Sequence, residues 1–297
     1  KEWSLARFYA LVGFFEGAMS GVVLSSNLVL SYFLLEMLTL STYLLVGFWY
    51  AQPLVVTAAR DAFLTKRVGD VLLLMGVVAL SALAGSTEFT DLYVWAARAR
   101  DLHLISPLAI TLLCLGLVAG PIGKCAQFPM HLWLDEAMEG PNPASILRNS
   151  VVVTCGAIVL LKLMPIIALS PLATMVLLVV GTISAIGGSL VALAQVDLKR
   201  AFSYSTTSYL GLVFIAIALQ KPGIALLFLF AHGLARALQF MGVGSIIATT
   251  NCQDLTELGG IGSRMPATAV AFLVGSAGLV GLAPLGGFWC YGLMVDS

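Results

Sequence analysis

Charged residues are scarce in this chain. Aspartate, glutamate, lysine and arginine make up 10% of its 297 residues, whereas hydrophobic residues make up 60%. Soluble domains contain roughly 25% charged and about 45–50% apolar residues. So few charges cannot hydrate the surface of a soluble fold of this length, and the surplus apolar surface has to face lipid. The composition therefore predicts a polytopic membrane protein.

Other absences narrow the function. The net charge is zero, so no excess of basic residues points to nucleic acid as a partner. The five cysteines are widely spaced without a CxxC pair, whereas iron–sulfur clusters require grouped thiolates. Neither a complete GxGxxG motif nor a phosphate-binding loop is present. We expect no cofactor and no metal in this chain, no nucleic-acid partner, and the lipid bilayer as its surroundings.

Long apolar runs fill most of the chain, and about 20 such residues span the hydrocarbon core as a helix. We predict an all-α transmembrane bundle of nine spans. The longer connections are expected at residues 51–68, 85–104 and 251–265. The predicted spans cover residues 6–26, 28–50, 69–84, 105–137, 150–168, 173–194, 204–219, 223–248 and 267–295.

Two of these spans are too long and contain helix breakers. Residues 120–124 and Pro129 interrupt the span 105–137, and residues 284–287 interrupt the span 267–295. Proline removes a backbone donor and clashes with the preceding turn. Two broken helices in corresponding positions are typical of inverted repeats around a central ion path. Ordinary proline kinks in a helix bundle are the alternative.

Several ionisable residues fall inside the apolar runs, where a charge costs about 2.5–3.5 kcal/mol by insertion scales. Glu36 lies deep in its span, and Lys124 lies at the first helix break. We expect these two to pair, because each would restore the charge of the other, and to load and release a proton as their spacing changes. A static ion pair that fixes helix packing is the alternative. The ionisable residues within spans are Glu16, Glu36, Asp70, Lys124, Lys162, His232 and Arg236.

The remaining charges have open interpretations. His232 and Arg236 are four residues apart and share a helix face. Imidazole can relay protons, whereas guanidinium acts only as a fixed or moving charge; a structural pair is the alternative. Lys162 lies late in its span and can extend its ammonium to the interface. Asp70 lies near a predicted membrane edge, where it could cap a helix or pair with Arg67.

The segment from residue 123 to 145, which contains Lys124, Pro129 and the Met-Glu-Gly-Pro run at 138–141, is distinctive. It closely resembles chain 5 of respiratory complex I, the NADH:ubiquinone oxidoreductase. The Arg-Val-Gly-Asp run at 67–70 also favours chain 5 over the related chains 4 and 2. Further matches in the same order, which extend the resemblance over essentially the whole chain, lie at residues 36–48, 197–206 and 232–238.

The resemblance implies the antiporter-like fold, in which two five-helix inverted repeats each contain a broken helix. The chain would cover the family's fourth to twelfth helices, as expected for a fragment or the product of a split gene. Residues 1–168 would form the first repeat, with its break near Lys124–Pro129. Residues 169–297 would form a second, incomplete repeat, with its break near Pro284–Gly287.

The resemblance also implies a function. The chain would be a proton-translocating subunit of the membrane arm, coupled to NADH:ubiquinone electron transfer, without a redox site of its own. NADH, FMN, iron–sulfur clusters and ubiquinone would be held by other subunits, and chain 4 and accessory subunits would be its neighbours. The mitochondrial inner membrane is the expected location, with the bacterial plasma membrane as the alternative. An Mrp-type cation/proton antiporter subunit and a non-pumping structural subunit are the rival functions.

Individual residues can be matched to the family. Glu36 matches the glutamate of the fifth helix, Asp70 the aspartate of the sixth, Lys124 the lysine of the broken seventh, and His232 a histidine of the eleventh. We expect these four and Arg236 to form the proton relay, with secondary contributions that come from Lys162, Arg148 and Lys199.

Four positions depart from the family pattern, and three of them lie in the second half. Arg236 stands where the family usually has lysine, and Arg148 where it has histidine. Tyr291 and Gly292 replace the lysine and aspartate of the second broken helix. Arginine keeps the charge but does not readily lose its proton. A conventional proton path through the second half is therefore in doubt.

Overall fold

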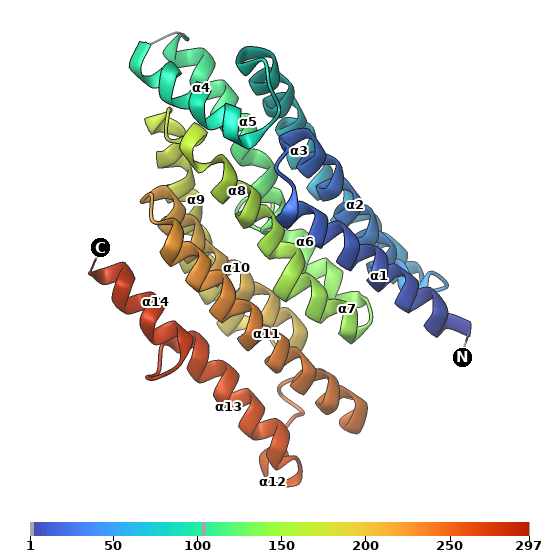
Figure 1. Ribbon diagram of the computed structural model, residues 1–297. Helices are drawn as coiled ribbons and strands as arrows, with labels where there is room; N and C mark the ends of the chain where they lie inside the picture. Colours follow the sequence, from blue (N-terminus) through green and yellow to red (C-terminus); the bar gives the residue numbers. More distant parts are fainter. Residues whose placement is uncertain (1–2, 103–104, 297) are drawn as a thin grey trace.

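The computed structural model describes residues 3–102 and 105–296, and its regular elements are all helical. The helices run side by side at modest angles and form one bundle (Figure 1). Their bounds are α1 Trp3–Leu24, α2 Leu28–Val46, η1 Gly47–Trp49, α3 Pro53–Ala84, α4 Phe89–Leu102, α5 Pro107–Lys124, α6 Leu132–Glu136, η2 Ala137–Glu139, α7 Asn142–Leu147, η3 Arg148–Val152, α8 Val153–Ile167, α9 Pro171–Ala194, α10 Leu198–Ala218, α11 Pro222–Thr250, α12 Ile261–Arg264, α13 Pro266–Val280 and α14 Gly286–Val295.

Helix starts follow local sequence signals. Proline occupies the first turn of α3, α5, α9, α11 and α13, where its missing N–H costs nothing. Asn27, Ser106 and Ser170 cap α2, α5 and α9 by accepting a backbone N–H with their side chains. These caps provide acceptors for backbone N–H groups, which lipid chains cannot hydrogen-bond.

The prediction of an all-α membrane bundle is confirmed. Eight helices of the described residues are long and apolar enough to span a membrane, with α7, η3 and α8 counted as one. The predicted ninth span is divided into α13, with 15 residues, and α14, with 10 residues, each shorter than a full span. Both predicted breaks are present: α5 ends at Lys124 before α6, and α13 ends at Val280 before α14.

One predicted connection was wrong, and a second, which does connect two candidate spans, contains a helix. Residues 51–68 are largely helical, because α3 begins at Pro53 and continues for 32 residues. The charges that lowered the apolarity of this stretch are accommodated in the helix: Lys66, for example, is buried, with its ammonium 4.3 Å from the Trp133 ring. Residues 85–104 contain the amphipathic helix α4, which buries Leu92 and Ala96 and exposes its polar side.

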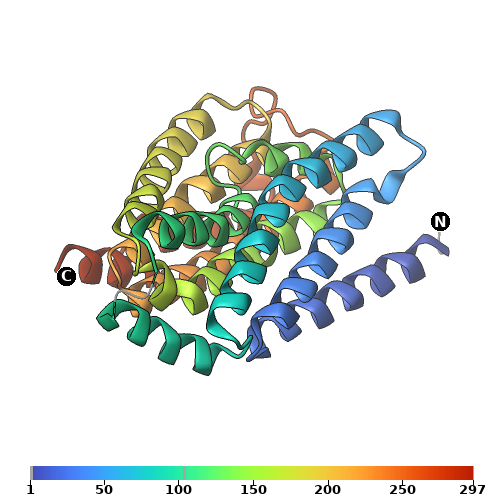
Figure 2. The same cartoon turned by 90° about the horizontal axis from the view of Figure 1, so that it is seen from above.

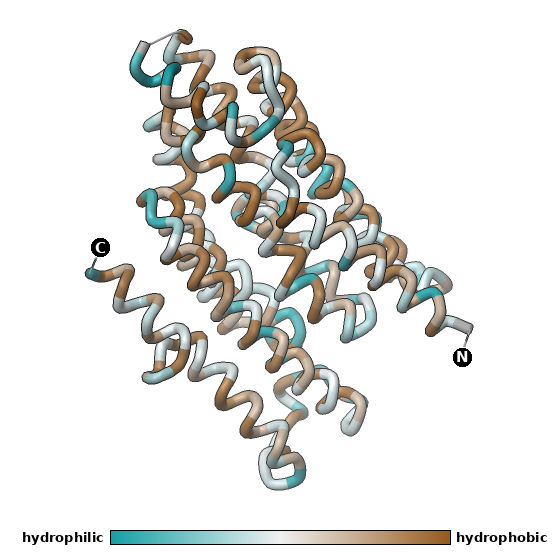
Figure 3. The backbone as a smooth tube through the Cα atoms, viewed as in Figure 1, coloured by the Kyte–Doolittle hydropathy of each residue, from teal (hydrophilic) through white to brown (hydrophobic). Residues whose placement is uncertain are grey.

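The chain begins and ends at opposite edges of the bundle. Helices α1 to α3 form one edge and α13 with α14 the other, with α5, α8, α10 and α11 between them (Figures 1 and 2). Hydrophobic residues dominate the helices along their lengths, and polar residues gather mainly near helix ends and loops (Figure 3). Helix α9 leaves Met175 60% exposed and Leu190 63% exposed, as expected for a surface that lipid covers.

Candidate proton-transfer site

The first helix break places Lys124 at the centre of the bundle. Pro121 lies inside the last turns of α5, and the helix ends at Lys124. A cation is favourable here because the carbonyl end of a helix carries partial negative charge. Lys124 is 2% exposed, so the chain ends this helix in the interior with an ammonium group.

Near the break, backbone N–H and C=O groups form hydrogen bonds with neighbouring side chains. The Trp133 indole donates to the Gly123 carbonyl at 2.7 Å, and the Phe128 amide donates to the Ser184 hydroxyl at 2.9 Å. The Gln127 amide group donates to the Cys125 carbonyl at 2.9 Å. Irregular backbone at membrane depth is stable only with such partners, so the break is a built feature of the fold.

Lys124 forms a buried ion pair with Asp70. Its Nζ lies 2.6 Å from Asp70 Oδ1, and the two side chains are 2% and 1% exposed. The Lys124 ammonium also donates to the Thr39 hydroxyl, whose Oγ1 lies 3.4 Å from Asp70 Oδ2. Lys124, Asp70 and Thr39 therefore form a charged triad contributed by α5, α3 and α2.

Glycines bring the triad together. A Cβ at Gly69 would lie 2.8 Å from the Ala119 carbonyl oxygen, and a Cβ at Gly120 would lie 2.6 Å from the Leu73 side chain. Such distances leave no room for a side chain, so α3 and α5 approach closely only because these residues are glycine. The approach puts Asp70, next to Gly69, within reach of Lys124.

The expected direct pair between Glu36 and Lys124 was wrong. Glu36 instead forms an ion pair with Arg67, and its side chain is 19% exposed. Asp70 lies near the middle of the 32-residue helix α3 and pairs with Lys124 rather than with Arg67. One turn of α2 separates Glu36 from Thr39, so Glu36 reaches Arg67 while Thr39 reaches the Lys124 pair. Both ion pairs include a residue of α3: Arg67 pairs with Glu36 of α2, and Asp70 pairs with Lys124 of α5.

The second half contains cations without a carboxylate partner. Arg236 on α11 is 1% exposed and donates to Gln239 Oε1 at 2.8 Å and to the Ser205 hydroxyl. His232 is fully buried, with its Nε2 3.1 Å from the Asn149 carbonyl oxygen and its ring 5.0 Å from that of Tyr209. Because a carbonyl only accepts, Nε2 carries the proton in this bond.

Arg148 lies in the π-helical turn η3, which also supplies the Asn149 carbonyl to His232. π-helical turns occur frequently at functional sites. The Arg148 guanidinium is fully buried and donates to the Ser145 hydroxyl at 2.9 Å. It packs against Gly140, where a Cβ would lie 2.9 Å from Arg148 Nη1.

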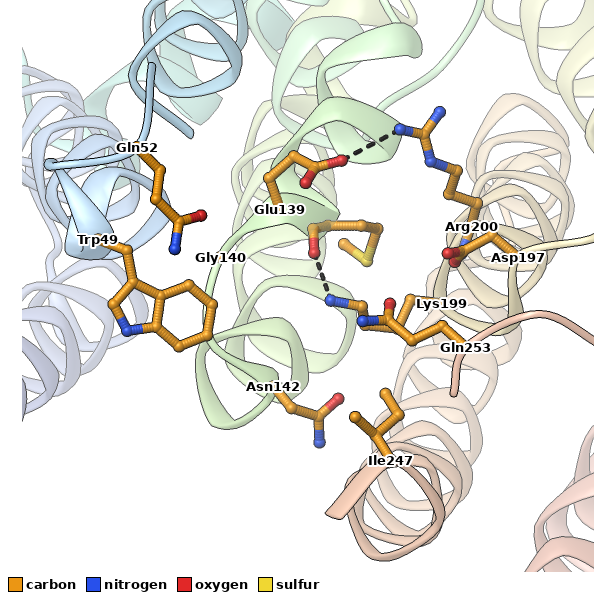
Figure 4. Close-up of a pocket in the computed structure, with 11 residues that line it drawn as sticks. Trp49, Gln52, Glu139, Gly140, Asn142, Asp197, Lys199, Arg200, Ile247 and Gln253 are labelled. Carbon is orange, nitrogen blue, oxygen red and sulfur yellow. Dashed lines mark hydrogen bonds and ion pairs between the residues drawn. The ribbon is translucent and has the colours of Figure 1, made fainter. Parts of the chain in front are cut away.

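Lys199 lines a polar cavity of about 420 Å³ at the bundle end that contains the 137–141 and 195–197 connections (Figure 4). Its ammonium donates to the Met138 carbonyl at 2.6 Å. The next residue of α10, Arg200, forms an ion pair with Glu139 at 3.1 Å. Gly140 lines this cavity and also contacts the Arg148 guanidinium, so the cavity lies next to Arg148.

Lys162 is positioned as a helix cap. Its ammonium donates to the carbonyls of Val22, Val23 and Ser25 at 2.8, 3.0 and 2.8 Å. These carbonyls belong to the end of α1, where a cation is favoured. The described contacts of Lys162 do not connect it to Lys124 or Asp70.

Sequence reasoning missed two residues of the site. Thr39 was not singled out, although it lies three residues after Glu36 and so shares its helix face. Lys66 was taken as a connection residue, although it lies four residues before Asp70; it is 1% exposed. The described residues contain no group of three or more His, Cys, Asp or Glu side chains that could hold a metal ion.

The sequence model described as "NADH:quinone oxidoreductase/Mrp antiporter, TM" matches residues 25–295. The chain belongs to this family. It is 75% identical over 296 residues to NAD(P)H-quinone oxidoreductase subunit 5 of the organellar chromatophore of Paulinella chromatophora, covering 100% of this chain and 47% of that protein. It is 39% identical over 293 residues to the chloroplastic subunit 5 of Lobularia maritima, covering 95% of this chain and 39% of that protein.

A solved member of the family has the same fold. The Mrp complex from Dietzia sp. DQ12-45-1b contains a chain that superposes with a TM-score of 0.89 at 26% identity, covering 97% of this chain and 32% of that one. The chain thus spans less than half the length of these relatives. Neither named relative is mitochondrial, so the expected mitochondrial location has no support from them.

Proposed function

We propose that this chain is a proton-translocating part of the membrane arm of an NAD(P)H-quinone oxidoreductase. The buried pair of Lys124 and Asp70 at the first helix break is the observation that carries this proposal. Family membership and the 75% identity to a subunit 5 support it. The redox groups, including NAD(P)H, flavin, iron–sulfur clusters and quinone, would be held by other subunits.

Charge separation within the triad would drive proton release. While Asp70 lies 2.6 Å away, it stabilises the protonated form of Lys124. Breaking a buried ion pair costs about 3–5 kcal/mol, because an uncompensated charge remains in an apolar site. A movement that separates the pair would therefore expel the proton from Lys124.

Glu36 and Arg67 provide the means to control the separation. Their ion pair spans the same two helices that supply Thr39 and Asp70. When Arg67 is released from Glu36, its positive charge can compete with Lys124 for Asp70. A charge change at one pair then alters the proton affinity at the other, which would couple the site to events elsewhere in the assembly.

The finer location and neighbours are also proposals. The named relatives belong to a chloroplast and a chromatophore, so we propose an energy-coupling membrane of that kind or of a bacterium rather than the mitochondrial inner membrane. Chain 4 and accessory subunits are the proposed neighbours in the membrane arm.

An Mrp-type cation/proton antiporter subunit is the second candidate, because a chain of a solved Mrp complex has the same fold at a TM-score of 0.89. The two functions differ in their driving reaction. Mild detergent extraction followed by identification of co-purifying subunits separates them: redox subunits support the first proposal, and their absence with sodium/proton exchange supports the second.

The proposed function can be tested by changing Asp70 to Asn in the assembled complex. We expect Asp70→Asn to remove this chain's share of the protons taken up per NAD(P)H oxidised in proteoliposomes, because the neutral amide no longer stabilises the Lys124 ammonium. Quinone reduction per assembled complex should continue.

Asp61→Asn is the matched control, because Asp61 lies on the same helix but pairs with Arg60 in an exposed ion pair at 2.8 Å. Its proton uptake should equal that of the wild type. Wild-type uptake by Asp70→Asn at equal assembly would exclude the triad from proton transfer.

A further inference from the structure

Lys66 is a buried lysine one helical turn away from Asp70. Its side chain is 1% exposed, so residues of this chain enclose it on all sides. Its Nζ lies 4.3 Å from the centre of the Trp133 ring and makes none of the described hydrogen bonds or ion pairs. An aromatic ring attracts a cation, but it cannot neutralise the charge as a carboxylate can. The ring therefore holds Lys66 beside the triad without fixing its protonation state.

Trp133 connects Lys66 to the first helix break. The indole N–H donates to the carbonyl of Gly123 at 2.7 Å, and Gly123 directly precedes Lys124. A Cβ at Gly123 would lie 3.9 Å from the carbonyl oxygen of Lys66, so the last turn of α5 packs against α3 at this residue. A movement of the end of α5 would therefore act on both lysines.

Asp70 has the position and the capacity to serve both lysines. Lys66 and Asp70 are four residues apart on α3, a spacing that places two side chains next to each other on one helix face. Lys124 lies 2.6 Å from Asp70 Oδ1. The described hydrogen bond to Oδ2 is a long one, at 3.4 Å from the Thr39 hydroxyl. A carboxylate can accept about four hydrogen bonds, so Asp70 can also accept one from Lys66.

Charged groups of several helices act on Lys66. Asp70 of α3 attracts its ammonium form, whereas Lys124 of α5 and Arg148 of η3 repel it, and the Cys155 thiol of α8 also interacts with it. Two ammonium groups that share one carboxylate therefore influence each other's protonation. The other carboxylates on α2, α6 and η2, which pack against α3, are Glu36, Asp135, Glu136 and Glu139.

We propose that Lys66 is a second proton-exchanging group of the site and shares the Asp70 carboxylate with Lys124. This inference rests on the proposed function. Lys66 lies on the side of Asp70 that is nearer to the exposed ion pair of Arg60 and Asp61 on α3. A proton taken up from that side would convert the Lys66 amine to an ammonium, which would draw Asp70 away from Lys124. Lys124 would then release one proton for each proton that Lys66 accepts.

Proton uptake per NAD(P)H oxidised by the assembled complex in proteoliposomes tests the proposal. Lys66→Met removes the exchangeable proton, and Lys66→Arg keeps the positive charge but does not readily lose its proton. We expect both variants to lose this chain's share of the uptake while quinone reduction continues. Wild-type uptake by either variant at equal assembly would overturn the proposal, because packing or a fixed charge would then suffice.

Lys66→His adds a readout that a purely structural role would not change, and it decides the matter if the arginine variant does not assemble. Imidazole exchanges its proton near pH 6.5, so we expect uptake relative to the wild type to be restored at about pH 6 and lost at about pH 8. At the higher pH the imidazole stays neutral and cannot draw Asp70 away from Lys124. Uptake relative to the wild type that is the same at both pH values would overturn the proposal.

Arg60→Met is the matched control, because it removes a cation of the same helix whose side chain is 62% exposed. Its uptake should equal that of the wild type at both pH values. The Asp70→Asn complex separates this inference from the proposed function. Loss of uptake by Asp70→Asn together with wild-type uptake by Lys66→Arg would overturn only the role of Lys66. Wild-type uptake by Asp70→Asn would overturn both.

Discussion

Lys124 and Lys162 are lysines of the same bundle, but their surroundings give them different chemistry. Lys124 faces the ionisable carboxylate of Asp70 at 2.6 Å. Lys162 faces three backbone carbonyls at the end of α1, at 2.8 to 3.0 Å. Backbone carbonyls cannot accept a proton from the ammonium as a carboxylate can, so these contacts hold Lys162 in place without exchanging a proton. The same residue type is therefore suited to proton exchange at one position and to fastening helices at the other.

Lys162→Gln should lower stability without changing proton uptake. Each hydrogen bond from a charged group contributes about 1.5–3 kcal/mol, and glutamine cannot reproduce three of them. We expect the purified complex to unfold at a lower temperature, measured by the loss of its quinone reductase activity on heating. Protons taken up per NAD(P)H should remain unchanged.

Lys221→Gln is the control for Lys162, because the Lys221 side chain makes none of the described hydrogen bonds and its loss should leave the unfolding temperature in place. Reduced proton uptake by Lys162→Gln at equal assembly would instead put Lys162 in the relay.

The sequence marked three ionisable residues of the site but missed Thr39 and Lys66, and it did not predict how the charges pair. Glu36, Asp70 and Lys124 are conspicuous because each lies in an apolar run. Their pairing depends on how far one helix slides along another. Close contacts at Gly69 and Gly120 set that register. The sequence pattern of a single helix does not encode how two helices are aligned.

At the scale of helices, α9 and α10 are held together by small residues. A Cβ at Gly211 would lie 2.5 Å from the Gly181 carbonyl oxygen and 2.7 Å from the Ala185 amide nitrogen. Both are backbone atoms, which cannot rotate away. Close packing of this kind drives helix association in lipid, where hydrophobic burial contributes little. These glycines therefore allow the close contact between α9 and α10.

Gly211→Ala should force α9 and α10 apart. Overpacking typically costs 1–3 kcal/mol, so we expect the variant to unfold at lower temperature and to assemble in smaller amounts. Gly187→Ala is the control on α9, because its Cβ would meet nothing within 4 Å and alanine favours helix. Equal stability of the two variants would show that the α9–α10 contact does not determine the packing.

The positions of most helices could be predicted, because apolar runs and proline starts are local signals. Two features could not. Helix α3 begins at Pro53 and includes the buried Lys66, whose ammonium lies over the ring of Trp133, a contact between distant segments. The π-helical turn at Arg148–Val152 has no sequence signal that we recognised, although it supplies the carbonyl that holds His232.

At the scale of the whole molecule, the two halves of the bundle differ in their electrostatics. The half that contains the first break has ion pairs, Lys124 with Asp70 and Glu36 with Arg67. The half that contains the second break has Arg236, which no described carboxylate neutralises. The division into repeats at residues 168 and 169 stays a prediction. Arg148 of the first half is also buried and makes none of the described ion pairs, so it is the pair of Lys124 and Asp70 that favours the first half as the place of proton exchange.

The central claim is that Lys124 exchanges a proton rather than only providing charge. The direct measurement is proton uptake per NAD(P)H oxidised by assembled complexes with Lys124→Arg or Lys124→Ala. Arginine keeps the charge but not the ability to lose a proton at physiological pH. We expect Lys124→Arg to lose nearly as much proton uptake as Lys124→Ala. Normal uptake by Lys124→Arg at equal assembly would contradict it, because a fixed charge would then suffice.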